Sequence, residues 1–164
     1  MNFKDECYAD VANLVFRHRW AALATMNATQ PAASMVAYAP YYSENCLLFL
    51  LSKLAPHTDQ LIKNSECSLV ISQQDDGVCD PQTLSRISFN GSVSQVSRHK
   101  SVFSELKQIY CSCLPASERL FGFADFSLFQ FRPKLGRYVG GFGRAYNLSE
   151  RHIDMIFTIK EQGV

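Results

Sequence analysis

The sequence predicts a mainly β, α+β domain, in which an antiparallel sheet of six to seven strands is closed or nearly closed on itself and carries peripheral helices. Short apolar segments recur at hairpin spacing, and several show the two-residue alternation of half-buried strands. The helical patterns are few and do not alternate with strands as they would in βαβ units. A chain of 164 residues is long enough for one sizeable core, and no internal repeat divides it.

The first predicted element is an amphipathic helix over residues 5–18. Its apolar residues recur at steps of three and four, at Cys7, Val11, Leu14 and Val15. Arg17 and His18 fall in the last turn, where cations interact favourably with the helix dipole. We therefore interpret His18 as a helix-end cation rather than as a catalytic residue.

A hairpin, two further strands and a short helix follow. Residues 20–26 and 31–39 are apolar segments joined by a polar turn, which is typical of a hairpin. Residues 46–51 are almost continuously hydrophobic and too few for a credible helix, so they predict a buried strand. A short helix over 59–64 opens near Pro56 and Thr58, and residues 67–72 predict the next strand.

The second half of the chain predicts one long strand, a helix and two shorter strands. A polar loop over 73–83 leads into a strand over 84–96 that bends at Gly91. Ser101 opens a helix, and an aromatic-rich turn over 121–126 precedes strands at 127–133 and, after a turn, 136–139. We divide the chain into a barrel domain, residues 1–147, and a C-terminal helical tail, residues 148–164.

Composition argues against several classes of function. The 16 Lys and Arg residues balance the 15 Asp and Glu residues. The densest cationic stretch, Arg98-His99-Lys100, is short, so we interpret it as a solvated helix entrance and expect no nucleic-acid partner. No apolar segment approaches membrane-spanning length, so we expect no membrane association and a soluble, cytoplasmic protein. Most of the six scattered cysteines fit core positions, and a structural zinc site is not expected.

Three stretches of the chain resemble a known family. They are Trp20 to Met26 with Pro31 to Ser34 after the turn, Leu50 to Thr58 with Leu61, and Gly122-Phe123-Ala124-Asp125-Phe126 followed by Val139 to Ala145. The sequence thereby resembles the pyridoxamine 5′-phosphate oxidase-like, FMN-binding split-barrel superfamily, and within it the heme-utilisation branch of the HugZ/HutZ type. The resemblance spans about residues 11 to 146. It implies a homodimer whose two split barrels lie side by side, with cofactor sites at the interface.

The resemblance places a flavin phosphate near the end of the third strand. Ser52, Lys53, His57 and Thr58 match that location, where hydroxyl groups, a cation and a helix N-terminus suit a dianion. The alternative is that Thr58 caps the helix, Lys53 is solvated and His57 packs against a turn. Flavin-binding relatives usually carry a further basic residue on the second strand, where this chain has Ser34, so FMN is our alternative cofactor.

Heme, our leading cofactor, requires a flat apolar slot, partners for its propionates and an axial ligand. The resemblance implies that Gly141, Phe142 and Arg144 lie close to the cofactor. Glycines let the backbone approach a macrocycle, and Arg144 offers donors for a propionate or for distal stabilisation. The alternative is a glycine-rich barrel turn that ends in a surface arginine.

His152 is our predicted axial ligand of the heme iron, because the heme-utilisation branch supplies its ligand from the region after the barrel. Ser149 predicts an N-cap, and the helix that follows places His152 on one face with Met155, Ile156 and Ile159. The alternative is a histidine packed in the core. Asp125, within the family-like stretch, is the preferred carboxylate to orient the ligand, and Asp154 is the other candidate.

The leading functional hypothesis is oxidative heme degradation of the heme oxygenase type, as part of heme iron utilisation. An external electron donor would be its second partner, Arg144 and Asp125 would serve catalysis, and the cofactor would supply the chemistry. One alternative is an FMN- or F420-type oxidoreductase that uses residues 52–58, and another is a non-catalytic heme carrier. No hydrolase elbow, zinc-protease motif, phosphate-binding P-loop or dinucleotide fingerprint occurs in the chain.

Overall fold

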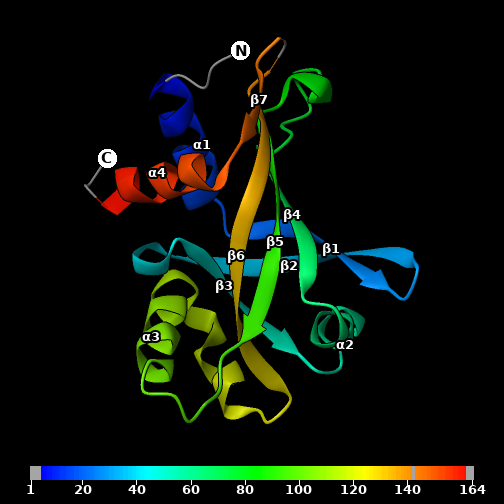
Figure 1. The fold of residues 1–164 in the computed structure, drawn as a ribbon, viewed down its shortest axis with the longest axis vertical. Helices are drawn as coiled ribbons and strands as arrows, with labels where there is room; N and C mark the ends of the chain where they lie inside the picture. The colour runs from blue at the N-terminus through cyan, green and yellow to red at the C-terminus, as the bar shows by residue number, and fades with distance from the viewer. Residues whose placement is uncertain (1–4, 142, 162–164) are drawn as a thin grey trace.

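The computed structural model describes residues 5–141 and 143–161, whose strands form one antiparallel sheet that closes into a barrel (Figure 1). The strands are β1 (Trp20–Asn27), β2 (Gln30–Tyr41), β3 (Cys46–Ser52), β4 (Glu66–Ser72), β5 (Arg86–Gln95), β6 (Phe126–Val139) and β7 (Ala145–Leu148). Their order is β3-β2-β1-β4-β5-β6-β7, and pairing of β3 with β6 closes the barrel and leaves β7 as an additional strand. The predicted fold class is confirmed.

Helices cover the openings and one side of the barrel (Figure 1). They are α1 (Asp5–Arg17), α2 (Pro56–Lys63), α3 (Phe103–Cys113) and α4 (Glu150–Glu161), with short 3-10 helices η1 (Tyr42–Glu44), η2 (Pro81–Thr83) and η3 (Pro115–Gly122). Helices α1 and α4 pack against each other beside the upper half of β6, whereas α3 and η3 lie beside its lower half. No helix in the described part of the chain is long and apolar enough to cross a bilayer.

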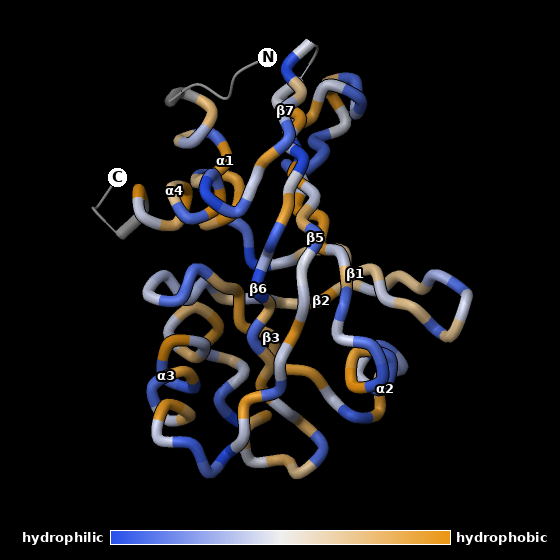
Figure 2. The backbone as a smooth tube through the Cα atoms, in the orientation of Figure 1, coloured by the Kyte–Doolittle hydropathy of each residue, from blue (hydrophilic) through white to orange (hydrophobic). Residues whose placement is uncertain are grey.

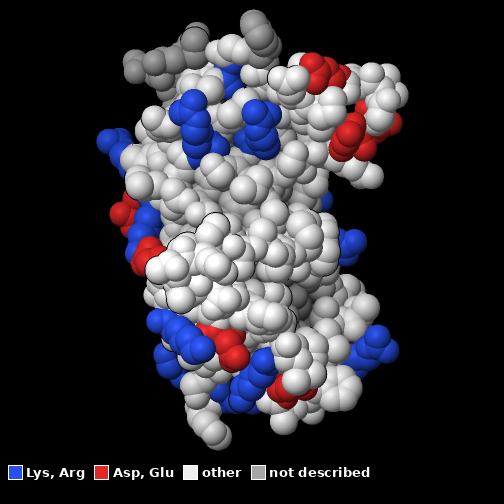
Figure 3. Space-filling model, turned by 90° about the vertical axis from the view of Figure 1, so that its right-hand side faces the viewer, with Lys and Arg blue, Asp and Glu red and all other residues white. Residues whose placement is uncertain are grey.

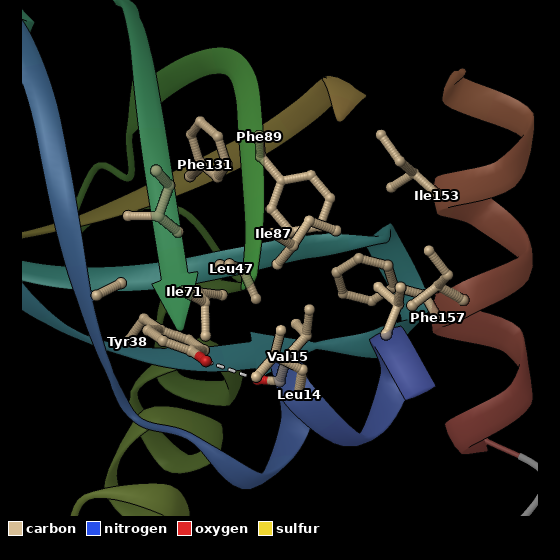
Figure 4. Packing of buried hydrophobic residues seen from close by; sticks show 14 of the residues in the cluster. Leu14, Val15, Tyr38, Leu47, Ile71, Ile87, Phe89, Phe131, Ile153 and Phe157 are labelled. Carbon is tan, nitrogen blue, oxygen red and sulfur yellow. Dashed lines mark hydrogen bonds between the residues drawn. The ribbon is translucent and has the colours of Figure 1, made fainter. Parts of the chain in front are cut away.

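The main core fills the barrel and continues under α1 and α4. Aromatic residues such as Phe89 and Phe131 point inward from the strands, and Leu14 of α1 and Phe157 of α4 pack against the same cluster (Figure 4). The buried hydroxyl of Tyr38 donates a hydrogen bond of 2.7 Å to the Val15 carbonyl. This bond satisfies a polar group that burial would otherwise leave unpaired, and it fixes the end of α1 on the sheet.

Strand β3 is buried on both faces, which explains its unbroken hydrophobicity (Figure 2). Leu47, Phe49 and Leu51 belong to the main core inside the barrel. The alternate residues face outward into a second cluster beneath α3: Cys46, Leu48 and Leu50. Because successive side chains of a strand point to opposite faces, a strand covered on both sides carries no polar alternation.

Three of the six cysteines are buried as expected, including Cys7, whereas Cys79 is exposed and Cys111 and Cys113 are half-buried. Cys46 and Cys67 are buried and free. Burial raises the pKa of each thiol to about 12. Both side chains therefore remain protonated at neutral pH and behave as small apolar residues.

The predicted turn between strands at 127–133 and 136–139 is wrong, because β6 is one strand of 14 residues. Pro133 lies opposite Gly91 and Leu135 lies opposite Asn90, so Lys134 is an extra residue in the ladder. A β-bulge of this kind accommodates a proline, which cannot donate a ladder hydrogen bond. The bend predicted at Gly91 is confirmed by the same register shift.

Residues 148–161, the described part of the segment that the sequence sets apart as a tail, pack onto the barrel. Strand β7, which the sequence analysis does not foresee, pairs with the end of β6. The buried face of α4 consists of Ile153, Ile156 and Phe157, all of which belong to the main core. Met155, which the sequence predicts on the packing face, is 40% exposed.

Candidate functional site

Several of the residues predicted to bind a cofactor meet at the lower end of the barrel, where β3 ends and α2 begins. The Ser52 hydroxyl donates a hydrogen bond of 2.6 Å to the Asp125 carboxylate, and the Lys53 amide donates one of 2.8 Å to the Asp125 carbonyl. The Thr58 hydroxyl donates to the Ser52 carbonyl at 2.6 Å. These bonds tie the end of β3 to the start of β6 and to α2.

His57 and Thr58 occupy the first turn of α2, but neither caps it. The N-cap is Ala55, which has no side-chain acceptor, and Thr58 is fully buried inside the helix. The alternative interpretation of Thr58 as the cap is therefore wrong. Partial burial lowers the pKa of His57, so its imidazole is neutral at physiological pH and adds no charge for a phosphate.

Arg144 lies at the opposite end of the barrel, in the turn between β6 and β7. Its guanidinium forms an ion pair of 2.7 Å with Asp10 of α1 and contacts the Cys7 sulfur at 3.9 Å. The carboxylate of Asp10 and then the thiol of Cys7 raise the pKa of Arg144. The turn needs glycine at Gly141, where φ is +100°, a value that other residues rarely adopt.

His152 lies in the first turn of α4 and contacts α1. Its Nδ1 accepts a hydrogen bond of 3.0 Å from the Ser149 amide and lies 3.1 Å from the Ser149 hydroxyl. Since the Ile153 amide donates to the Ser149 carbonyl, Ser149 is the N-cap, as predicted, and the His152 side chain binds the amide of this N-cap residue, as the third helical residue of a capping box does. The imidazole ring lies 6.1 Å from the ring of Tyr8, centre to centre.

The predicted site residues thus form two separate groups in one chain. The lower group holds Ser52, Lys53, His57, Thr58 and Asp125, and the upper group holds Gly141, Arg144 and His152, whereas Phe142 lies outside the described residues. Strand β6 connects the groups, and its 14 residues span roughly 40 Å at the usual rise per strand residue. Asp125 therefore cannot orient His152 within the same chain.

Two sets of residues near these groups are absent from the sequence-based prediction. Asp10 and Tyr8 of α1 contact the upper group, and nothing in the local sequence indicates this, because the contacts join the two ends of the chain. At the lower end, Arg98 and His99 line a cavity of about 480 Å³ together with Lys53. Their signal in the sequence is the densest cationic stretch, which the sequence analysis interprets as solvated.

The outer face of β1, β2 and β4 is uncharged across its middle (Figure 3). Met35, Ala22 and Val70 lie side by side in neighbouring strands, and Ser88 of β5 continues the row. Trp20 is 57% exposed and Met35 is 47% exposed on this face. Charged side chains of both signs lie above and below the band (Figure 3).

A family model fits almost the entire chain. The model of the CREG β-barrel family matches residues 4–153. The chain belongs to the CREG β-barrel family.

This CREG β-barrel chain is similar to two curated proteins. It is 26% identical over 123 residues to the heme oxygenase HutZ of Vibrio cholerae, covering 70% of this chain and 66% of that protein. It is 31% identical over 118 residues to the chloroplastic non-canonical heme oxygenase HOZ of Arabidopsis thaliana, covering 71% of this chain and 34% of HOZ. The chain thus spans less than two thirds of either relative's own length.

Solved structures share the fold of this CREG β-barrel. A heme binding protein from Mycobacterium smegmatis superposes with a TM-score of 0.81 at 19% identity, over 93% of this chain and 62% of that one. ChuZ from Campylobacter jejuni superposes with a TM-score of 0.77 at 20% identity, over 93% of this chain and 62% of that one. A protein of the pyridoxinephosphate oxidase family from Clostridium acetobutylicum superposes with a TM-score of 0.70 at 12% identity, over 92% of this chain and 99% of that one. The split-barrel fold implied by the sequence resemblance is confirmed.

Proposed function

We propose that this protein binds heme and degrades it oxidatively with electrons from an external donor, in heme iron utilisation. Support comes from the two curated relatives, both named heme oxygenases, and from the upper group of residues. Heme would be the substrate and would also supply the redox-active iron. The protein's own residues would bind and orient it, and a reducing compartment such as the cytoplasm would suit the six free thiols.

The observation that carries this proposal is the convergence of Arg144 and His152 on α1. Arg144 reaches Asp10 and Cys7, and His152 reaches Tyr8, so a guanidinium, an imidazole and an aromatic ring border one end of the barrel. These are the groups that a heme needs for a propionate, for the iron and for the face of the macrocycle. Binding of iron through Nε2 requires His152 to give up the hydrogen bond that Nδ1 accepts from Ser149.

The lower group fits a flavin phosphate poorly. The hydroxyls of Ser52 and Thr58 already donate to the Asp125 carboxylate and to a main-chain carbonyl. The carboxylate of Asp125 would repel a phosphate bound beside the Ser52 hydroxyl, and the neutral imidazole of His57 would not offset it. Ser34, which stands where flavin-binding relatives carry a basic residue, supplies no charge. FMN remains the alternative cofactor, supported by the fold of the pyridoxinephosphate oxidase relative.

A homodimer would bring the two groups together. The uncharged outer face of β1, β2 and β4 is a surface that a second copy of the chain can cover. A two-fold axis through its centre, perpendicular to the long axis of the barrel, would set the lower end of one subunit beside the upper end of the other. Asp125 could then act on His152 of the partner subunit, which it cannot do within its own chain.

Hemin titration tests the proposal. We expect a shifted Soret band in the wild-type protein and an altered band with weaker binding in His152→Ala. His18→Ala is the matched control, because His18 is also half-buried at a helix end and is bonded at 2.7 Å to the Leu14 carbonyl. An unchanged Soret band in His152→Ala would refute the ligand assignment.

Turnover separates degradation from transport. With ascorbate and oxygen, we expect loss of the Soret band and release of iron that a ferrous chelator detects. Intact heme under these conditions would favour the carrier hypothesis, and a flavin absorption band in the purified protein would favour FMN.

Light scattering tests the dimer. Met35→Glu should give monomers, whereas Met155→Glu, at an exposed methionine outside the uncharged face, should leave the dimer intact.

A further inference from the structure

The cavity at the lower end of the barrel is lined by basic side chains, and none of the described residues in its wall is a carboxylate. It has a volume of about 480 Å³ and lies between the end of β3, the segment 95–99 and the start of β6. Lys53, Arg98 and His99 line it. In the part of the chain that the structure describes, none of these three side chains takes part in an ion pair. The nearest acid along the chain, Asp125, is bonded to Ser52 instead.

The guanidinium of Arg98 is held rigidly in the wall. It donates to three main-chain carbonyls, at 2.9 Å to Phe121 and at 3.0 Å to both Phe123 and Phe126. Neutral carbonyls satisfy its N–H groups but do not cancel its positive charge. A fixed charge of this kind attracts an anion without a further ordering cost.

The rest of the wall is also fixed, and part of it is apolar. The Val96 amide donates to the Leu128 carbonyl at 2.8 Å, and the Gln95 amide group donates to the Ser127 hydroxyl at 3.0 Å. Val96 and Leu128 are buried, and Phe126 is partly buried beside them. The cavity therefore offers cationic groups on one side and a preformed apolar surface on the other.

We propose that this cavity binds a small phosphate monoester, with the phosphate between Lys53, Arg98 and His99 and the organic part against Phe126 and Val96. Three cationic or donor side chains suit a dianion better than a single carboxylate. A cavity of this size lies within the usual range of small-molecule sites. The site is distinct from the upper group around His152, and the proposal stands whether or not the protein degrades heme.

Calorimetric titration with phenyl phosphate and with inorganic phosphate tests this proposal. We expect one phenyl phosphate per chain, bound more tightly than inorganic phosphate because the apolar wall contacts the ring. His99→Gln and Lys53→Gln should each weaken binding about tenfold, the usual effect of a lost charge-assisted hydrogen bond. Both side chains are exposed, so both variants should fold, which thermal melting checks.

Two control variants distinguish binding in this cavity from diffuse attraction and from binding at α2. Lys100→Gln removes a neighbouring charge that does not line the cavity, and it should change the affinity less than twofold, as expected for a screened surface charge. An equal loss in Lys100→Gln and His99→Gln would show diffuse attraction and overturn the proposal. His57→Gln should have no effect, and a loss of binding there would place the anion at α2 instead. Absence of any binding at millimolar ligand would also refute the site.

Discussion

Removal of the Ser52 hydroxyl should destabilise the lower end of the barrel measurably. This hydroxyl donates to the Asp125 carboxylate at 2.6 Å and accepts the Leu54 amide at 3.1 Å. A hydrogen bond to a charged group contributes about 1.5–3 kcal/mol, and partial exposure of both side chains reduces this to about 1–2 kcal/mol, because water replaces part of the bond. For a chain of this length, Ser52→Ala should lower the Tm by about 2–8 °C.

Urea denaturation of a double-mutant cycle isolates the contact. Ser52→Ala, Asp125→Ala and the double variant should give a coupling free energy of about 1 kcal/mol, whereas distant sites add within about 0.5 kcal/mol. Ser94→Ala, at an exposed serine of β5, is the control and should leave the stability nearly unchanged. A coupling below about 0.3 kcal/mol would show that the short Ser52–Asp125 bond contributes nothing, and the reasoning would fail.

Three further perturbations test other parts of the structure. Gly91→Ala places a methyl group against the Arg132 carbonyl and 2.9 Å from Pro133 Cα, so we expect chemical denaturation to show a free energy of unfolding lower by about 3 kcal/mol. Gly122→Ala is the control and should show no comparable decrease, because its methyl group meets open space. The pKa of His57 is lowered in the folded state, so protonation favours unfolding and stability falls as the pH drops below 6.5. Between pH 7.5 and 5.5, the Tm of His57→Gln should therefore decrease less than the Tm of the wild type. The Asp10–Arg144 pair is nearly half exposed, with side-chain exposures of 45% and 44%, so Asp10→Asn should cost less than about 1 kcal/mol of stability. If heme recruits Arg144, the same change should tighten hemin binding, whereas Glu44→Gln, which breaks a similar pair with Arg132, should not.

Local periodicity predicts most of the fold. The amphipathic helix, the first hairpin and the bend at Gly91 each depend on residues close in sequence, and all are confirmed. The continuity of β6 escapes prediction because Pro133 and Gly136 are turn residues in isolation. In the sheet, the pairing with β5 absorbs the irregularity as a bulge, so tertiary contacts decide the local structure.

The arrangement of the candidate site is much less predictable. Ser52 and Asp125 are 73 residues apart, and Arg144 and Asp10 are 134 apart, so no local pattern could indicate either contact. The cavity around Arg98 escapes prediction for a different reason. A cationic stretch is usually solvated. Here three main-chain carbonyls bind the Arg98 guanidinium and hold it in the wall of the cavity, and these contacts are not visible in the sequence.

The packing of α1 against α4 has a consequence for how the chain folds during synthesis. The ring of Phe16 lies 5.2 Å from that of Phe157, so α1 completes its core only with residues that are synthesised much later than α1 itself. Contacts of such long sequence separation form slowly, because a large loop must close first. Until α4 leaves the ribosome, the apolar face of α1 and one opening of the barrel stay exposed, and this is the interval in which a chaperone would matter most.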